Sequence, residues 1–388
     1  MPLLRLNSLS YSERLDQPKQ WILDGLRLGQ TNLLVGINST GKTRTLNVIH
    51  NLSRMILLHN NFRCANANYN VLFKGDDISL RYLVRVENGK VMQEEVELNS
   101  KRLLSRGEGG EGEIFAQEEG KNIRFKPPEN DLAVVARRDS LQHPFLEPLH
   151  EWAEAVRHYT FGTHLGKDHL AAFVKGAPEA DERNANFVVA IFRKGLTRFG
   201  DDFVAAVTRD MTGMNYDIET VGLYPPDGVT VMNSTGPMEL VGLGVQEQGV
   251  SGIVDQNDMS QGMFRALSII TQLNYSQMTQ RANCILIDDI GEGLDFDRTV
   301  RLIELLRKKA QQSQFQLIMT TNDQFVMNHV PLEDWSVLKR RGDHISVMNY
   351  DNSKELFDEF KFVGLSNFAF LELGFAEGLR PEELPSHE

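Results

Sequence analysis

An eight-residue run near the start of the chain has the residue types and spacing of a phosphate-binding loop. Residues 36–43 read Gly-Ile-Asn-Ser-Thr-Gly-Lys-Thr and match the P-loop (Walker A) pattern G-x-x-x-x-G-K-S/T at every fixed position. In such a loop, main-chain N–H groups and the dipole of the following helix attract phosphate. We therefore expect Lys42 to reach the β- and γ-phosphates of ATP and the Thr43 hydroxyl to ligate Mg²⁺. The other residues expected around the nucleotide are Gly36, Asn38, Ser39, Thr40, Gly41 and Arg44.

The residues on either side supply the elements that this loop needs. Residues 31–35 end in Leu-Leu-Val and suit a buried strand, whereas apolar residues recur at helical spacing over 44–58. A chance match in a glycine-rich turn would lack this strand and helix. The flanks therefore favour a nucleotide-binding loop.

A second group of candidate residues lies in the later half of the chain. Residues 284–287 read Cys-Ile-Leu-Ile and are followed by Asp288 and Asp289, which predicts a buried strand ending in an acidic turn. In P-loop ATPases the first acid holds the Mg²⁺ shell and the next orients or deprotonates the attacking water. The second position is more often Glu, and Asp289 is one methylene shorter. The attacking water would then lie at a less favourable distance unless the backbone shifts or Glu292 contributes, so we expect slow basal hydrolysis. A core strand that ends in a solvated acidic turn is the alternative.

A third candidate segment precedes the acidic strand. Ser260 has the position of an N-cap, because apolar residues at 263, 267 and 270 follow at helical spacing. The hydroxyl, the main-chain N–H groups and the helix dipole at Ser260, Gln261 and Gly262 can together bind an anion. An ordinary helix cap is the alternative, but the position between P-loop and acidic strand favours phosphate.

This order of motifs resembles that of the ABC-type ATPases of the SMC/RecF/OLD branch, especially the stand-alone ATP-binding proteins of bacterial anti-phage defence systems. Residues 259–262 are similar to the L-S-x-G signature, with Met for Leu, and residues 288–295 to Walker B running into the D-loop. Residues 316–323 are similar to the strand that ends in a switch histidine, which is Asn322 here, and Ser39 stands where Gly is usual. The resemblance covers about half of the chain, and no Toprim-like nuclease acids follow.

The resemblance implies a composite site in a dimer. Two protomers would meet head to tail, each placing Ser260, Gln261 and Gly262 on the γ-phosphate that the other holds. ATP binding would close the dimer and hydrolysis would open it. Asn322 would hydrogen-bond the γ-phosphate without carrying a proton. Arg265 would either reach the transferred charge or the partner, or form a structural salt bridge.

Composition excludes several classes of protein. The net charge of −12 over 388 residues argues against a generally DNA-coating surface, although Arg137-Arg138 or residues 339–341 could line a local basic groove. No apolar stretch is long enough to span a membrane, and the N-terminus soon meets charge, unlike a secretory signal. The two cysteines lie far apart in sequence, so a reducing cytoplasm fits best.

The patterning predicts an α/β fold with an antiparallel β-lobe and a helical insertion, and the resemblance implies that its core is a P-loop ABC-type ATPase domain. Residues 78–98 alternate in polarity around a turn at 87–90, which predicts a β-hairpin. Helical spacing follows Pro148 and extends over 185–215, and 335–348 suits a second hairpin. The predicted divisions are an N-terminal half with P-loop and β-lobe (1–140), a mainly helical insertion (141–240), a C-terminal half of the ATPase domain (241–350) and a tail (351–388).

The C-terminal tail is rich in phenylalanine. The simpler interpretation is that these rings pack onto the ATPase core, and the alternative is an exposed apolar patch for a partner protein. The five rings are Phe357, Phe360, Phe362, Phe368 and Phe370.

The predicted function is an ATPase that acts as a dimerising sensor or switch subunit of a separately encoded effector, a nuclease or toxin, in anti-phage defence. The ATPase prediction comes from residues, whereas the defence role comes from the resemblance alone. Three alternatives stay open: a RecF- or SMC-like repair ATPase that clamps DNA, a transporter subunit, and a scaffold that binds ATP and barely hydrolyses it. The long insertion and the missing switch histidine argue against a transporter.

Overall fold

The computed structural model of the chain describes residues 4–59, 62–174, 179–226, 238–280, 284–313 and 315–375. The chain separates into two compact units. The chain crosses between them after Val156, Ala282, Leu286 and Ser313, and the crossings after Val156 and Leu286 lie inside strands β10 (Val156–Thr160) and β15 (Cys284–Asp288). The four divisions proposed along the sequence stay a prediction. Unit 1 comprises Met1–Val156, Asn283–Leu286 and Gln314–Glu388, and unit 2 comprises Arg157–Ala282 and Ile287–Ser313.

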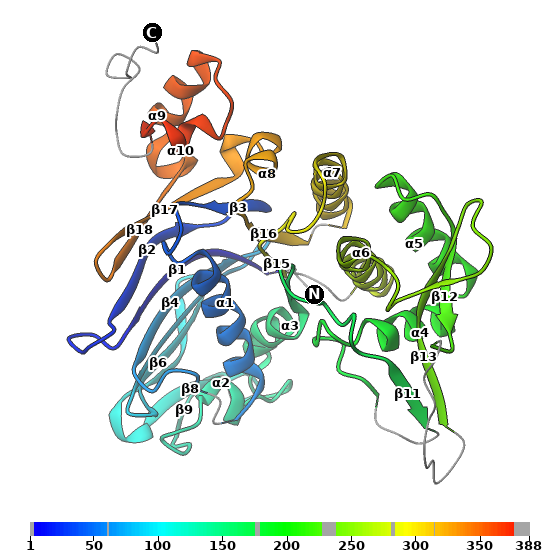
Figure 1. Cartoon of the computed structure of the whole chain (residues 1–388). Helices are drawn as coiled ribbons and strands as arrows, with labels where there is room; N and C mark the ends of the chain where they lie inside the picture. Colours follow the sequence, from blue (N-terminus) through cyan, green and yellow to red (C-terminus); the bar gives the residue numbers. More distant parts are fainter. Residues whose placement is uncertain are drawn as a thin grey trace. The chain divides into compact units, whose positions relative to one another are not determined.

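The larger of two sheets carries the P-loop. Its 14 strands have the order β10-β15-β16-β3-β17-β18-β2-β1-β4-β5-β6-β7-β8-β9 (Figure 1). Strand β3 (Thr31–Val35) is parallel to both of its neighbours, β16 (Gln316–Thr320) and β17 (Trp335–Arg341). Every residue of β3 and β16 is buried, as expected for parallel strands covered on both faces. The strands expected at 31–35 and 316–320 are confirmed.

The remaining strands of unit 1 form the predicted antiparallel β-lobe. The hairpin expected at 78–98 is β5 and β6, which pair with Glu87 opposite Lys90. Strand β18 (His344–Asn349) joins the lobe to the parallel strands, because it is antiparallel to β17 and parallel to β2. The lobe strands are β1 (Arg5–Glu13), β2 (Trp21–Arg27), β4 (Ala67–Lys74), β5 (Ser79–Glu87), β6 (Lys90–Leu98), β7 (Lys101–Arg106), β8 (Gly112–Ala116) and β9 (Lys121–Phe125).

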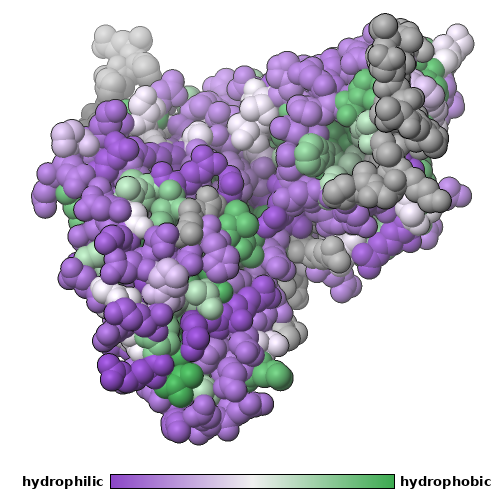
Figure 2. Space-filling model, turned by 90° about the horizontal axis from the view of Figure 1, so that it is seen from below, coloured by the Kyte–Doolittle hydropathy of each residue, from purple (hydrophilic) through white to green (hydrophobic). Residues whose placement is uncertain are grey.

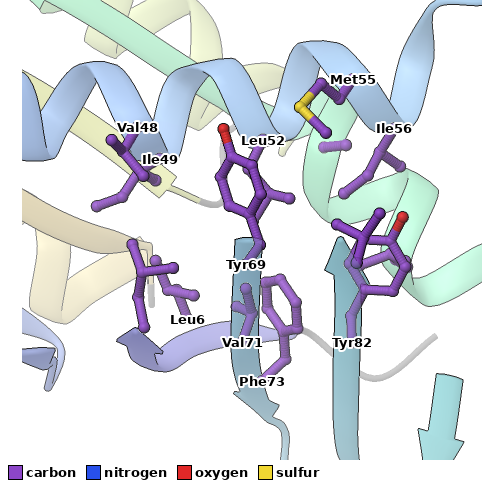
Figure 3. Close-up of a cluster of buried hydrophobic side chains, with 14 of the residues drawn as sticks. Leu6, Val48, Ile49, Leu52, Met55, Ile56, Tyr69, Val71, Phe73 and Tyr82 are labelled. Carbon is purple, nitrogen blue, oxygen red and sulfur yellow. The ribbon is translucent and has the colours of Figure 1, made fainter. Parts of the chain in front are cut away.

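Helix α1 (Lys42–Leu57) covers one face of this sheet. Its apolar side lies over β1, β4 and β5, so that P-loop and sheet share one core (Figure 3). Each fully buried apolar side chain there contributes about 1.5–3 kcal/mol. The other helical segments of unit 1 are α2 (Ala133–Ala136), α3 (Glu147–Ala155), α8 (Gln324–His329), α9 (Tyr350–Val363), α10 (Ala369–Glu372) and the short 3₁₀ turns η1 (Glu108–Gly110), η2 (Pro144–Leu146) and η3 (Leu332–Asp334).

The phenylalanine-rich tail packs on unit 1 through most of its rings. Phe357, Phe360 and Phe370 are buried, and the rings of Phe357 and Phe370 stack with centroids 4.7 Å apart. Phe368 is half-buried. Phe362 is 96% exposed. The packing interpretation is therefore confirmed for three rings, and Phe362 alone of the five stands in solvent.

Two variants distinguish the buried phenylalanine rings from the exposed one. Replacing Phe357 with Ala should destabilise unit 1 by about 3–5 kcal/mol, because a buried ring leaves a cavity. Phe362→Ala is the matched control and should change stability by less than about 0.5 kcal/mol. Denaturation followed by fluorescence of the buried Trp335, whose ring centroid lies 6.5 Å from that of Phe370, would measure both. Equal losses would contradict the packing.

Unit 2 combines helices with a second, antiparallel sheet. The helical segment expected at 185–215 is two helices broken at Gly200, whose φ is +59°. Helix α6, which starts after Ser260, packs against α4 and α5. The helices are α4 (Val188–Phe199), α5 (Asp201–Gly213), α6 (Gln261–Thr279) and α7 (Phe296–Ser313), and the strands are β11 (Ala171–Val174), β12 (Ile218–Tyr224), β13 (Met238–Glu247) and β14 (Val254–Asp255).

A buried ion pair fixes α6 within unit 2. The Lys309 ammonium lies 2.7 Å from the Asp210 carboxylate and donates to Asn274 Oδ1 and Gln277 Oε1 at 3.0 Å each. These residues lie on α5, α6 and α7. Because an unpaired buried charge is strongly destabilising, the network holds the three helices in one arrangement.

One face of the molecule is mainly polar. Figure 2 shows a face on which hydrophilic residues predominate and hydrophobic ones lie singly or in small groups, as is usual for folded proteins. Among the helices described here, none combines the length and the hydropathy needed to cross a bilayer.

Candidate nucleotide-binding site

The P-loop connects β3 to α1 and needs glycine at two positions. Gly36 and Gly41 have φ values of +153° and +102°, which other residues rarely adopt. A Cβ on Gly36 would lie 2.7 Å from the carbonyl oxygen of Leu338, and one on Gly41 would lie 3.1 Å from the Trp21 ring. The loop is thus closely packed against β17 and β2, which fixes its curvature.

Ser39 occupies a strained position in the same loop. Its φ is +66°, in the left-handed region that favours glycine and costs other residues about 1–2 kcal/mol. Arg340, on β17, donates from Nη1 to the Ser39 carbonyl oxygen at 3.0 Å. This bond supports the loop from outside, and it gives one member of the basic run 339–341 a structural role that the sequence did not predict.

The two P-loop cations, Lys42 and Arg44, both have partners near the loop. The Lys42 ammonium is buried and donates to the Gly36 carbonyl at 2.7 Å, within the curve of the loop. Arg44 lies over the Trp21 ring at 4.5 Å and pairs with Glu13. These partners offset the unfavourable interaction of a cation with the N-terminus of α1. Thr43 is exposed in the first turn of α1.

The segment with Asn322 ends at the same sheet edge as the P-loop. Strands β16 and β3 are parallel, with Thr320 opposite Leu34. The segments that follow the two strands therefore leave the sheet at the same end. Asp323 then caps α8, because its carboxylate accepts from the Phe325 N–H at 2.7 Å. Asn322 is exposed between β16 and this cap. The fold therefore places Asn322 and the P-loop at neighbouring strand ends, while the expected contact of Asn322 with a γ-phosphate stays a prediction.

The acidic segment of unit 2 has an unusual backbone. Asp288 is buried at the end of β15, and Asp289 follows with a φ of +54°. Gly291 and Gly293 also have positive φ, while Glu292 is exposed. Asp and Asn tolerate this region better than longer side chains. The backbone therefore gives a physical reason for the short acid at 289.

Gly162, which the sequence analysis did not single out, lies beside the side chains of Asp289 and Glu292. A Cβ on Gly162 would lie 4.0 Å from the Asp289 Cβ and 3.9 Å from the Glu292 Cδ. The preceding residue, Phe161, donates its N–H to the Asp288 carbonyl at 2.8 Å. The loop that follows β10 therefore borders the acidic segment. No motif marked it, because a single glycine carries no spacing pattern.

The signature-like segment begins α6 as predicted. The Ser260 hydroxyl accepts from the Met263 N–H at 3.2 Å, which confirms the N-cap. The Gln261 side chain donates to the Thr163 carbonyl at 3.3 Å. A Cβ on Gly262 would overlap the carbonyl oxygen of Gly293. Glycine is required here by contact with the segment that follows the two acids.

The guanidinium of Arg265 donates hydrogen bonds to main-chain carbonyls. From the sequence, one expectation was a structural salt bridge to an acidic side chain. Nε donates to Thr163 O at 2.8 Å, Nη1 to Glu292 O at 2.8 Å and Nη2 to Gly162 O at 3.0 Å. Burial lowers the pKa of the guanidinium, and the nearby Glu292 charge opposes this shift. Sequence reasoning could not find these bonds, because any residue type can supply a carbonyl.

A family comparison fits this geometry. Residues 31–328 match the family described as "AAA domain, putative AbiEii toxin, Type IV TA system". The chain belongs to this AAA-domain family. The match includes the P-loop, the signature-like segment, the acidic segment and Asn322, so the chain is a P-loop ATPase-domain protein. No curated protein matches it.

Solved structures show a distant likeness. An SMC head bound to the C-winged helix domain of ScpA has 13% identity and a TM-score of 0.49, over 88% of this chain and 96% of that chain. The SMC head domain from Thermotoga maritima has 10% identity and a TM-score of 0.46, over 89% and 98%. The cbiO1 protein from Clostridium perfringens, part of the ABC transporter complex cbiONQ, has 12% identity and a TM-score of 0.40, over 97% and 99%.

Proposed function

We propose that this AAA-domain protein binds ATP with Mg²⁺, hydrolyses it slowly and works in the cytoplasm as a dimerising switch that controls a separate effector, a nuclease or toxin, in anti-phage defence. The observation that carries the proposal is the P-loop, with two sterically required glycines and a buried lysine ammonium on the Gly36 carbonyl. The family match supports the ATPase part. Its description names a toxin–antitoxin system, which supports a defence role.

The residues suit hydrolysis of a phosphoanhydride. Lys42 would hold the β- and γ-phosphates, and Asn322 would donate to a γ-phosphate oxygen. Asp289, or Glu292 in its place, would accept a proton from the water whose oxygen attacks the γ-phosphorus as its bond to the bridging oxygen breaks. Thr43 and Asp288 would supply oxygen donors, which Mg²⁺ prefers. When bound, Mg²⁺ supplies charge neutralisation at the phosphate oxygens.

The dimer part of the proposal rests on the signature-like segment. Ser260 is exposed at the start of α6, where its hydroxyl and the helix dipole are available to an anion on another molecule. In a head-to-tail pair, each protomer would present Ser260, Gln261 and Gly262 to the γ-phosphate bound by its partner. ADP lacks that phosphate and would not hold the pair together.

Molar mass in solution tests the dimer. With Mg²⁺ and ATP, size-exclusion chromatography with light scattering should show twice the mass found with Mg²⁺ and ADP. Ser260→Arg should abolish the ATP-dependent dimer and leave ATP binding intact, because a large cation would fill the contact. Ser251→Arg, an exposed serine of the same unit, is the matched control and should dimerise normally. A monomer under all conditions would rule out the composite site.

Affinity capture tests the effector. Tagged protein recovered from its native host with ATP and Mg²⁺ should bring a nuclease or toxin chain that mass spectrometry identifies. The Lys42→Ala variant should lose that partner if the nucleotide controls the contact. Recovery of DNA-repair proteins instead would favour the DNA-clamping alternative, which predicts salt-sensitive duplex binding that requires ATP.

A further inference from the structure

The first turn of α6 is joined to the acidic segment by more than ordinary packing. Arg265 is 9% exposed, and three hydrogen bonds from its guanidinium reach two separate loops of unit 2. One loop follows β10 and offers the carbonyls of Gly162 and Thr163. The other follows β15 and offers the carbonyl of Glu292. One side chain thus holds the signature-like turn, the β10 loop and the acidic segment together.

Glycines bring the segments of this junction into close contact. Gly262 on α6 touches the main chain of Gly293, where any side chain would overlap. A Cβ on Gly293 would lie 2.6 Å from Arg265 Nη1, and Gly162 borders the side chains of Asp289 and Glu292. A closely packed interior transmits displacement because it has few voids. A shift of the α6 start therefore moves the acidic segment with it.

The choice of arginine matters for this junction. Its planar guanidinium presents donors in fixed directions, so three carbonyls on two loops can be held at once. A lysine ammonium is a compact charge on a flexible stem and cannot keep the same three directions. The bonds to Arg265 therefore fix the orientation of the loops as well as their distance from α6.

We propose that Arg265 is a positioning residue that couples the two nucleotide sites of the dimer through each protomer. This rests on the proposed function, in which Ser260 contacts the partner's nucleotide while Asp289 acts on the nucleotide of its own P-loop. Arg265 connects those two segments within one chain. When Ser260 contacts the γ-phosphate at one site, Arg265 therefore positions Asp289 at the other site. This coupling makes ATP hydrolysis cooperative. Coupling of this kind is reciprocal between the sites.

Steady-state hydrolysis by the full chain tests the coupling. Wild-type protein should show a Hill coefficient above 1 for ATP. In Arg265→Ala the coefficient should fall to about 1 and kcat should fall on the order of 10- to 100-fold, since small misplacements of reacting groups have effects of this size. The ATP affinity of the P-loop, measured by direct binding to dilute monomer, should change less than about twofold. A merely structural role would not lower kcat while leaving ATP affinity unchanged. Arg265→Lys should recover part of kcat and little of the cooperativity.

A matched control separates coupling from loss of fold. Arg106 is also buried and donates to the main-chain carbonyls of Pro128 and Asp131, but it belongs to the β-lobe. Arg106→Lys should lower the melting temperature and leave the Hill coefficient unchanged. If Arg265→Ala fails to fold, Arg265→Lys decides, and unchanged cooperativity in that variant overturns the proposal. If the wild-type protein does not hydrolyse ATP, the proposed function is refuted. If the wild type and the Arg265 variants hydrolyse ATP with the same cooperativity, only the coupling is refuted.

Discussion

Replacing Lys42 with Ala is expected to raise the Kd for ATP by at least about 100-fold. The ammonium lies inside the P-loop, buried and hydrogen-bonded to the Gly36 carbonyl, and in the proposed function it would bind the phosphates there. Charge-assisted hydrogen bonds are about twice as strong as neutral ones, and truncating one partner of a buried hydrogen-bonded charge pair typically costs about 2–5 kcal/mol of binding free energy. Isothermal titration with ATP and Mg²⁺ measures the change.

The control for this variant is a lysine of the same unit with no place in the loop. Lys74 is exposed on β4, and Lys74→Ala should bind ATP as the wild type does. Melting temperatures of both variants would show that each is folded. Undiminished binding by Lys42→Ala would rule out the P-loop assignment and, with it, the proposed ATPase.

The P-loop was accessible from the sequence because its requirements are local. Two glycines, a lysine and a threonine at fixed spacing define the curve, and α1 and β3 show their periodicity in the flanking residues. The hairpin of β5 and β6 was equally visible, since alternation and the turn at 87–90 agree. Where local pattern and fold coincide, sequence reasoning succeeds.

The parts that were missed depend on contacts between distant segments. Arg340 supports Ser39 through a carbonyl, and Arg265 holds two loops through three more. A main-chain acceptor is present at every residue, so it leaves no trace in residue types. The strands of the second sheet were also missed. Strand β13 contains two glycines, Gly242 and Gly244, which interrupt its apolar pattern. Glycine is needed at both positions because neighbouring side chains occupy the space where a Cβ would be.

Replacing Asp289 with Asn should lower kcat for ATP hydrolysis by about 10²–10⁴-fold with little change in ATP affinity. The amide cannot accept the proton that the attacking water must lose. Asn has the same size and also tolerates the +54° φ of this position, so the backbone should stay in place. Single-turnover hydrolysis and equilibrium binding separate the two quantities. Glu292→Gln is the matched comparison, and a larger loss in that variant would transfer the role of base to Glu292.

Lengthening the acid tests why hydrolysis is expected to be slow. In Asp289→Glu two effects compete, since a longer side chain is less suited to a positive φ but reaches the water from a better distance. The backbone strain of about 1–2 kcal/mol is present in the ground state and the transition state alike, so it lowers stability and largely cancels in kcat. Reach changes only the transition state, and kcat should rise by up to about tenfold. Unchanged turnover would show that the short acid does not limit the rate, and Asn322 would become the next residue to test.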